Sequence, residues 1–145
     1  RVHSMSDKLG YRGYIASRPI NGNRVPQHVQ NIVIRDYANR QGMKYLLSAT
    51  EMSPENCFIV LNDVLSNLDK IGGIILYSLF MLPKSYRARV KIYGLFLQNK
   101  KILHAAMENF LFETETDFQR LEEIFSLAKI LNKSQPPQEL KKWLN

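Results

Sequence analysis

The chain has 145 residues, of which 45% are hydrophobic and 23% are charged, values that exclude a disordered or fibrous protein and fit one globular domain. The net charge of +7 favours an anionic partner, which leaves nucleic acid, a nucleotide, a sugar phosphate and a membrane surface as alternatives. The single cysteine excludes an intramolecular disulfide and a cysteine-rich zinc site.

The single cysteine favours a reducing, cytoplasmic setting, and the distribution of apolar residues predicts no membrane span. No apolar run reaches the roughly 18 residues that a spanning helix needs, and the first residues lack the apolar core of a signal peptide. We expect residues 1–8 to lie outside the fold, residues 9–131 to form a single α/β domain, and residues 132–145 to form a linker and a short helix that docks Trp143.

The first strand, loop and helix follow one another directly. Residues 14–16 are an apolar run, and residues 17–25 contain Pro19, Gly22 and two asparagines, which are typical of turns. Pro26 suits the first turn of a helix that continues to about Gln41, and Gly42 can end that helix in a left-handed conformation.

Three further strands and three further helices are predicted along the chain. The strands are expected at residues 44–48, 74–77 and 102–106, and the helices from Ser53 and Pro54 to 67–69, at 86–98 behind Ser85, and at 117–131 behind Thr116. The third helix should bury Val90, Tyr93 and Leu97. Residues 74–77 are almost continuously apolar, which is typical of a central parallel strand.

Alternating strands and helices predict a three-layer α/β sandwich with a mostly parallel four-stranded sheet and helices on both faces. Ligands of such sheets bind at the carboxyl ends of the strands, where polar residues of this chain are concentrated. Phosphate-loop, dinucleotide and zinc-protease motifs are absent, so no metal and no other cofactor is predicted.

Four residues at these strand ends are candidates for catalysis. Ser17 could be a nucleophile, or it could cap its own loop. Glu51 and Glu108 could act as general acid and base, or they could pair with Arg18 or Arg35 to hold a loop. His104 could take part in catalysis or lie in the core.

The remaining candidates would bind a ligand. Arginines beside the free N–H groups of a helix start can hold an anion. We expect the ligand-binding residues to be Arg18, Arg24, Gln27, Gln30, Asn31, Arg35, Ser48, Tyr77 and Ser78. Ser17, Arg18, Glu51, Tyr77, Ser78 and His104 should converge on one cleft, and Arg18 should be the principal anion ligand.

Four stretches of the chain resemble the sporadic carbohydrate cluster family, small bacterial proteins found among surface-carbohydrate genes. They are GYIASRPINGNRVPQHVQNIVIRDY, LLSATE, GIILYSLFMLP and HAAMEN. The resemblance implies a pathway and no particular reaction. The resemblance implies that the characteristic polar positions of the family are Ser17, Arg18, Gln27, Gln30, Asn31, Arg35, Ser48, Glu51, Tyr77, Ser78, His104 and Glu108. It implies a cytosolic protein of surface-carbohydrate biosynthesis that binds or modifies a phosphorylated or nucleotide-linked sugar.

A looser resemblance is to the catalytic domain of serine recombinases, which opens with a strand of the form Y-A-R-V-S. Here Ala16 replaces the arginine and Ser17 comes one residue early, and residues 79–85 lack the aspartate of the family's L-D-R segment. The alternative function is therefore a resolvase-like DNA-binding protein that has lost or altered catalysis. An anionic small molecule is the favoured partner over nucleic acid, and a homo-oligomer is left open.

Overall fold

The computed structural model describes residues 9–52 and 57–133. They form an α/β fold with a five-stranded sheet in the order β2-β1-β3-β4-β5. The strands are β1 (Tyr11–Ala16), β2 (Tyr45–Glu51), β3 (Gly73–Leu76), β4 (Ile102–Ala105) and β5 (Phe110–Phe112). The first four are parallel, and β5 pairs antiparallel to β4.

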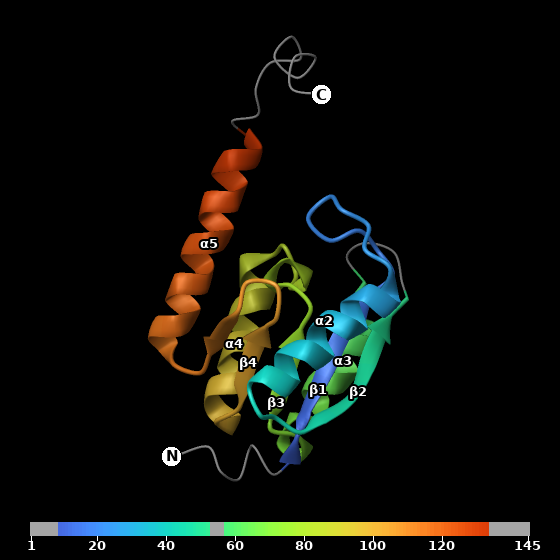
Figure 1. The fold of residues 1–145 in the computed structure, drawn as a ribbon. Helices are drawn as coiled ribbons and strands as arrows, with labels where there is room; N and C mark the ends of the chain where they lie inside the picture. The colour runs from blue at the N-terminus through green and yellow to red at the C-terminus, as the bar shows by residue number, and fades with distance from the viewer. Residues whose placement is uncertain (1–8, 53–56, 134–145) are drawn as a thin grey trace.

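The helices cover both faces of this sheet, as predicted. They are α2 (Gln27–Arg40), α3 (Ile59–Ser66), α4 (Tyr86–Asn99) and α5 (Glu115–Lys133), with short 3-10 turns η1 (Leu68–Lys70) and η2 (Leu79–Met81). Helix α2 lies on one face, and α3 and α4 lie on the other (Figure 1). Helix α5 follows β5 and packs beside α4, where the rings of Tyr93 and Phe118 stack with centroids 4.6 Å apart. The three-layer sandwich is thus confirmed.

The sheet differs from the expected one in two places. The fifth strand was not predicted, because three residues, Phe110 to Phe112, are too few to show an alternating pattern. Strand β2 continues through Glu51, whereas the prediction ended it at Ser48 and placed Glu51 in a loop. Strand β3 is central and all four of its residues are buried, which confirms the prediction made from its apolar run.

Local signals placed several helix ends correctly. Gly42 has a φ of +67° and its N–H donates to the carbonyl of Asn39, as expected for a left-handed residue after a helix. The Ser85 hydroxyl accepts a hydrogen bond from the amide of Ala88 and so caps α4. Ser53 and Pro54, the expected start of the second helix, lie outside the described residues, but α3 begins only at Ile59, later than predicted.

The prediction that α4 buries Val90, Tyr93 and Leu97 is confirmed for Tyr93 and wrong for the other two residues. Val90 and Leu97 are 43% and 37% exposed, while Arg89 is buried with Ile92 and Phe96. Arg89 can be buried because it pairs with Glu122 of α5, with a distance of 2.7 Å between Nε and Oε2.

Helix α5 begins earlier and ends later than expected. Thr114, rather than Thr116, caps it by accepting the amide of Asp117, whose own carboxylate accepts the amides of Glu113 and Thr114. The helix extends to Lys133, two residues beyond the predicted end. The remaining C-terminal residues, including Trp143, lie outside the described part of the chain.

Candidate functional site

The carboxyl edge of the sheet carries one fully buried carboxylate, Glu51 at the end of β2. Its Oε1 accepts the amide of Val60 at 3.1 Å, and its Oε2 accepts the amide of Leu61 at 3.0 Å. The hydroxyl of Tyr14 donates to Oε2 at 2.9 Å. These amides belong to the first turn of α3, so Glu51 supplies the acceptor that a buried helix start needs.

Tyr14 is a site residue that sequence reasoning did not single out. Burial, followed by the hydrogen bond to Glu51, raises the pKa of the Tyr14 hydroxyl above its ordinary value. The available signal was a phenol within an otherwise apolar strand, because a buried hydroxyl requires a partner.

Arg18 is held at the same helix start. Its Nη1 donates to the carbonyl of Cys57 at 2.8 Å, and its Nη2 lies 3.4 Å from the hydroxyl of Tyr14. The guanidinium also lies 4.5 Å from the centre of the Phe58 ring. Arg18 therefore reaches Glu51 only through Tyr14, and two of its N–H groups already have acceptors in the protein.

The polar loop after β1 is fastened by backbone and side-chain hydrogen bonds. Ser17 donates from its Oγ to the carbonyl of Glu51 at 3.3 Å, and its amide donates to the same oxygen at 3.0 Å. Asn21 and Gly22 have φ values of 50° and 81° between the paired residues Ile20 and Asn23, which makes a tight turn of the hairpin type.

Gln30 lies at the base of this loop and is completely buried. Its Oε1 accepts the amide of Ala16 at 3.1 Å, and its Nε2 donates to the carbonyls of Ala16 and Val25, each at 2.8 Å. The side chain therefore joins α2 to both ends of the loop. This geometry favours a structural role over the predicted ligand-binding role.

Ser78 and Glu108 meet at the ends of β3 and β4, as their positions predicted. The Ser78 hydroxyl donates to Glu108 Oε2 at 2.7 Å, and Glu108 Oε1 accepts the amide of Leu79 at 3.0 Å. Ser78 Oγ also accepts the amide of Phe80. The pair therefore holds the start of η2. Tyr77, which is buried beside it, donates from its amide to the carbonyl of Tyr14 at 3.3 Å.

His104 lies on the opposite face of the sheet, beneath α2. Its Nδ1 is 2.8 Å from the hydroxyl of Tyr37, and its ring packs edge-on against Tyr11, with centroids 5.1 Å apart. Glu51 faces α3 on the other side. The expected convergence on one cleft is therefore wrong for His104, because neighbouring strand positions that differ in parity face opposite sides of the sheet.

A second polar cluster joins α2 to β2. Asn31 Oδ1 accepts the hydroxyl of Ser48 at 2.7 Å and that of Tyr45 at 3.3 Å, and the two hydroxyls also contact each other. The guanidinium carbon of Arg35 lies over the ring of Tyr45, 5.5 Å from its centre. Gly13 leaves the room that Ser48 occupies, because a Cβ there would lie 2.4 Å from Ser48 Oγ. Asn31, Ser48 and Arg35 are thus brought together, away from Glu108.

The start of α2 remains open on the carboxyl edge. Pro26 occupies its N-cap position, no side chain caps the helix and no acidic residue lies in its first turn. Within the described residues, the amides of Gln27 and His28 donate to no acceptor. Arg24 is exposed, and its Nη1 lies 3.3 Å from the carbonyl of Ser17. The Nε2 of Gln27 lies 3.9 Å from the sulfur of Met52.

The described residues offer neither a metal-ligand cluster nor a membrane-spanning helix. No group of three or more His, Cys, Asp or Glu side chains could hold a metal ion there. None of the helices in that part of the chain is long and apolar enough to cross a membrane.

No family model matches the chain, and neither a curated protein nor a solved structure matches it.

Proposed function

We propose that this chain binds the phosphate of a phosphorylated or nucleotide-linked sugar at the carboxyl edge of its sheet, as a cytosolic protein of surface-carbohydrate biosynthesis. The start of α2 and the guanidinium of Arg24 would hold the phosphate. The observation that carries the proposal is the uncapped start of α2, where two amides point away from the helix without an acceptor in the described residues.

Three features of this edge support an anionic ligand. Arg24 is exposed and only weakly held, so its guanidinium can grip two phosphate oxygens. The first turn of α2 contains no acidic side chain that would compete for the amides. The net charge of +7 attracts anions over a longer range.

The surroundings of the candidate catalytic residues support binding more than they support a reaction. Glu51 and Glu108 each accept backbone amides, and His104 is enclosed between aromatic rings. The role of these residues and of Ser17 in catalysis stays a prediction.

A titration with defined probes tests the proposal. We expect sugar 1-phosphates or nucleoside diphosphate sugars to raise the melting temperature, and Arg24→Ala to weaken that binding tenfold to a hundredfold. A charge-assisted hydrogen bond contributes about 1.5–3 kcal/mol, and about 1.4 kcal/mol corresponds to a factor of ten. Arg24→Lys should recover only part of the loss, because an ammonium lacks the planar fork.

Arg18→Ala is the matched control. It also removes one arginine from the edge, but we expect it to lower stability through the lost contacts to Cys57 and Phe58. Folding of Arg24→Ala should change by less than about 0.5 kcal/mol, as is usual for exposed residues. Equal affinities of wild type and both Arg24 variants would contradict the proposal.

DNA is the second candidate ligand, and one surface favours it. The residues of α4 include no acid, and the exposed Arg87 and Lys91, with Lys84 just before the helix, form a basic face. DNA binding would weaken steeply with added salt because counterions are released, whereas phosphate binding at α2 should be less sensitive. Substituting Arg87 and Lys91 with glutamine would reduce the salt dependence only if this face contacts DNA.

A further inference from the structure

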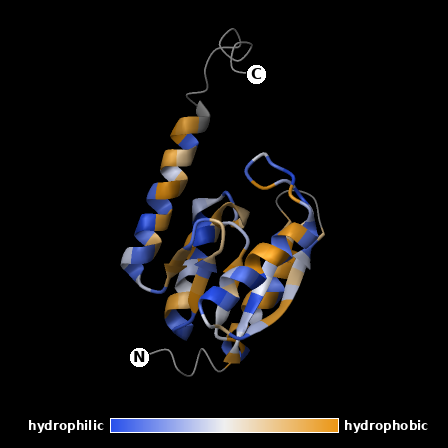
Figure 2. Ribbon diagram, in the orientation of Figure 1, coloured by the Kyte–Doolittle hydropathy of each residue, from blue (hydrophilic) through white to orange (hydrophobic). Residues whose placement is uncertain are grey.

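Helix α5 packs against the rest of the protein along its first half only. Phe118 and Leu121 are buried, whereas Leu127, Ile130 and Leu131 are 57%, 59% and 63% exposed. The last turns of α5 project past the sheet (Figure 1), and hydrophobic residues recur along them (Figure 2). The protein therefore presents an exposed apolar segment at this end of the helix.

The apolar residues of these turns share one side of α5. A helix turns by about 100° per residue, so Ile124, Leu127, Ile130 and Leu131 fall within an arc of about 120°. Lys129 lies about 160° from Leu131, on the opposite side. The second half of α5 is therefore amphipathic, and its four apolar residues are called the α5 tip below.

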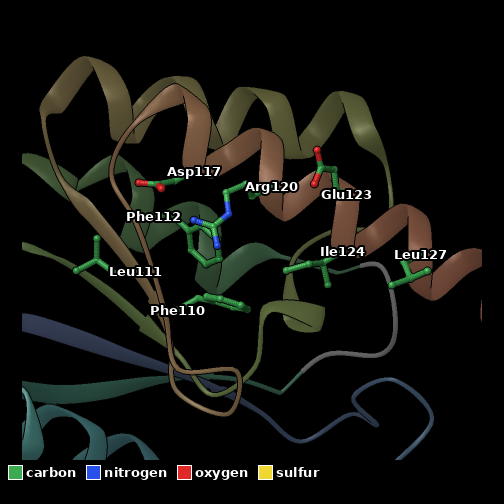
Figure 3. Close-up of a pocket in the computed structure, with 8 residues that line it drawn as sticks. All are labelled: Phe110, Leu111, Phe112, Asp117, Arg120, Glu123, Ile124 and Leu127. Carbon is green, nitrogen blue, oxygen red and sulfur yellow. The ribbon is translucent and has the colours of Figure 1, made fainter.

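The apolar surface continues from the α5 tip toward the sheet. A hollow of about 270 Å³ lies between α5 and β5. Figure 3 shows Phe110 and Phe112 on its strand side, with Ile124 and Leu127 on its helix side. Because Leu127 lines the hollow and is more than half exposed, the hollow and the tip form one apolar surface.

The charges of α5 are segregated along its length. All four acidic residues of the helix lie between positions 115 and 123. Residues 124–131 contain no acid and include the exposed Lys129. The part of α5 that leaves the body of the protein is therefore apolar and basic.

Helix α4 runs antiparallel to α5. Arg89 pairs with Glu122, and Tyr93, one turn further along α4, stacks on Phe118, one turn earlier in α5. Steps toward the start of α4 are therefore steps toward the end of α5. The start of α4 lies level with the second half of α5.

Two more cations lie at this end of the protein. Arg87 and Lys84 precede Arg89 by two and five residues, which places them about level with the α5 tip. Both are exposed, and Tyr86 between them is 64% exposed. Cations therefore accompany the exposed apolar residues at this end.

We propose that the α5 tip and the start of α4 bind the surface of an anionic lipid bilayer. The tip would lie at the boundary between headgroups and acyl chains, as amphipathic helices do on membrane surfaces. Lys84, Arg87 and Lys129 would contact the phosphates of the headgroups. Tyr86 has the apolar ring and polar hydroxyl of residues that are enriched at this depth.

Charge complementarity favours a bilayer over other occupants. DNA would attract the same cations but would leave the α5 tip in water. A second copy docked through this end would bring Lys84, Arg87 and Lys129 of both chains together, and like charges repel. An anionic bilayer offers acyl chains to the apolar residues and negative charge to the cations beside them.

Vesicle sedimentation tests the proposal with the full chain. We expect binding to vesicles of phosphatidylglycerol and phosphatidylcholine in equal amounts, and binding at least about tenfold weaker to phosphatidylcholine alone. Leu127→Ser combined with Leu131→Ser should weaken binding to the anionic vesicles at least about tenfold. Lys84→Gln combined with Arg87→Gln should weaken it about thirtyfold, since each cation near such a surface contributes about a factor of five.

Two control variants remove the same groups elsewhere. Ile32→Ser combined with Leu47→Ser removes apolar side chains that are 62% and 77% exposed on α2 and β2. Lys44→Gln combined with Lys70→Gln removes two exposed cations at the opposite edge of the sheet, before β2 and β3. Both controls should bind anionic vesicles within about twofold of the wild type, because salt screens distant charges. Circular dichroism and the melting temperature establish that each variant is folded.

A competition experiment separates this surface from the start of α2. An excess of a sugar 1-phosphate should leave the vesicle-bound fraction unchanged, and displacement would place the lipid phosphate at α2 instead. The variant with Leu127→Ser and Leu131→Ser should still bind the sugar phosphate like the wild type. Each of the two proposals can therefore fail without the other.

Other results would also overturn the proposal. Equal binding of the leucine variant and the wild type would exclude the α5 tip from the contact. Absence of binding to anionic vesicles would exclude a membrane surface. In that case, a dimer in light scattering that the leucine variant dissociates would identify a second copy as the occupant, and duplex DNA binding that is lost with Lys84→Gln and Arg87→Gln would identify DNA.

Discussion

Two helix starts at the same edge of the sheet have opposite surroundings. At α3, Glu51 accepts the amides of Val60 and Leu61, and Arg18 donates to the preceding carbonyl of Cys57. At α2, the amides of Gln27 and His28 meet no acceptor in the described residues. The protein supplies acceptors for the first amides of α3, whereas the first amides of α2 are left for solvent or a ligand.

Burial explains this difference. The start of α3 lies beside the fully buried Glu51, where unpaired amides would cost about 1–3 kcal/mol each. The start of α2 lies beside an exposed loop, where water can satisfy the same groups. A buried helix start therefore needs an acceptor from the protein, whereas an exposed helix start can keep its amides available for water or a ligand. Burial is what distinguishes the two.

Removing the acceptor at α3 should produce the largest effect. Glu51→Ala leaves two amides and the hydroxyl of Tyr14 without their partner, so we expect a loss of at least about 3 kcal/mol in the free energy of unfolding. Urea denaturation measures this loss. Glu123→Ala, a change at an exposed glutamate, should stay within about 0.5 kcal/mol. A loss below about 1 kcal/mol for Glu51→Ala would show that the start of α3 does not depend on Glu51.

High pH should weaken the α3 start through Tyr14. The pKa of Tyr14 is raised above its ordinary value of 10.0, so its contribution is complete below pH 10 and is lost as the pH rises further. The unfolded chain then releases a proton that the folded chain retains, which costs about 1.4 kcal/mol per pH unit. Tyr14→Phe should therefore make the free energy of unfolding fall less steeply between about pH 10 and 11, by about 1.4 kcal/mol per pH unit.

The control for this measurement is Tyr37→Phe, since burial also raises the pKa of Tyr37, on the other face of the sheet. The Tyr37→Phe substitution should also reduce the slope of the free energy of unfolding against pH, but it should not disturb α3. An unchanged slope in Tyr14→Phe would mean that Tyr14 ionises equally in the folded and unfolded chains.

The sequence predicted the parts of the fold that depend on neighbouring residues. The apolar run before Tyr77 identified the central strand, and Ser85 and Gly42 identified helix ends. These features depend on a few consecutive side chains. The burial of Arg89 could not be predicted in this way, because its partner Glu122 lies 33 residues further along the chain.

In the candidate site too, the features that depend on residues far apart in the sequence could not be predicted. Ser78 and Glu108 were each expected at a strand end, and they meet because the carboxyl ends of neighbouring parallel strands share an edge. The sequence could not assign Glu51 and His104 to opposite faces without the strand register. Nor could it show that Gln30 would be enclosed by the loop that it fastens, or that α2 would lack a cap.

A smaller change in stability than that of Glu51→Ala is expected from giving α2 a capping carboxylate of the kind that α3 has. Pro26→Asp places a carboxylate at the N-cap, where a cap contributes about 0.5–2 kcal/mol. Loss of the proline's restriction on the unfolded chain offsets about 0.4–1 kcal/mol of this. The net change in stability should therefore lie between a loss of about 0.5 kcal/mol and a gain of about 1.6 kcal/mol, while binding of a sugar phosphate should weaken at least tenfold because the new carboxylate occupies an amide and repels the anion.

Pro26→Asn separates these two causes of weaker binding. Asparagine also caps the helix but carries no charge, so its variant should bind the sugar phosphate between wild type and Pro26→Asp. Calorimetric titration of the three proteins, with urea denaturation of each, gives both quantities. If a cap at residue 26 stabilises the chain yet leaves phosphate binding unchanged, the start of α2 is open to water alone and the anion site lies elsewhere.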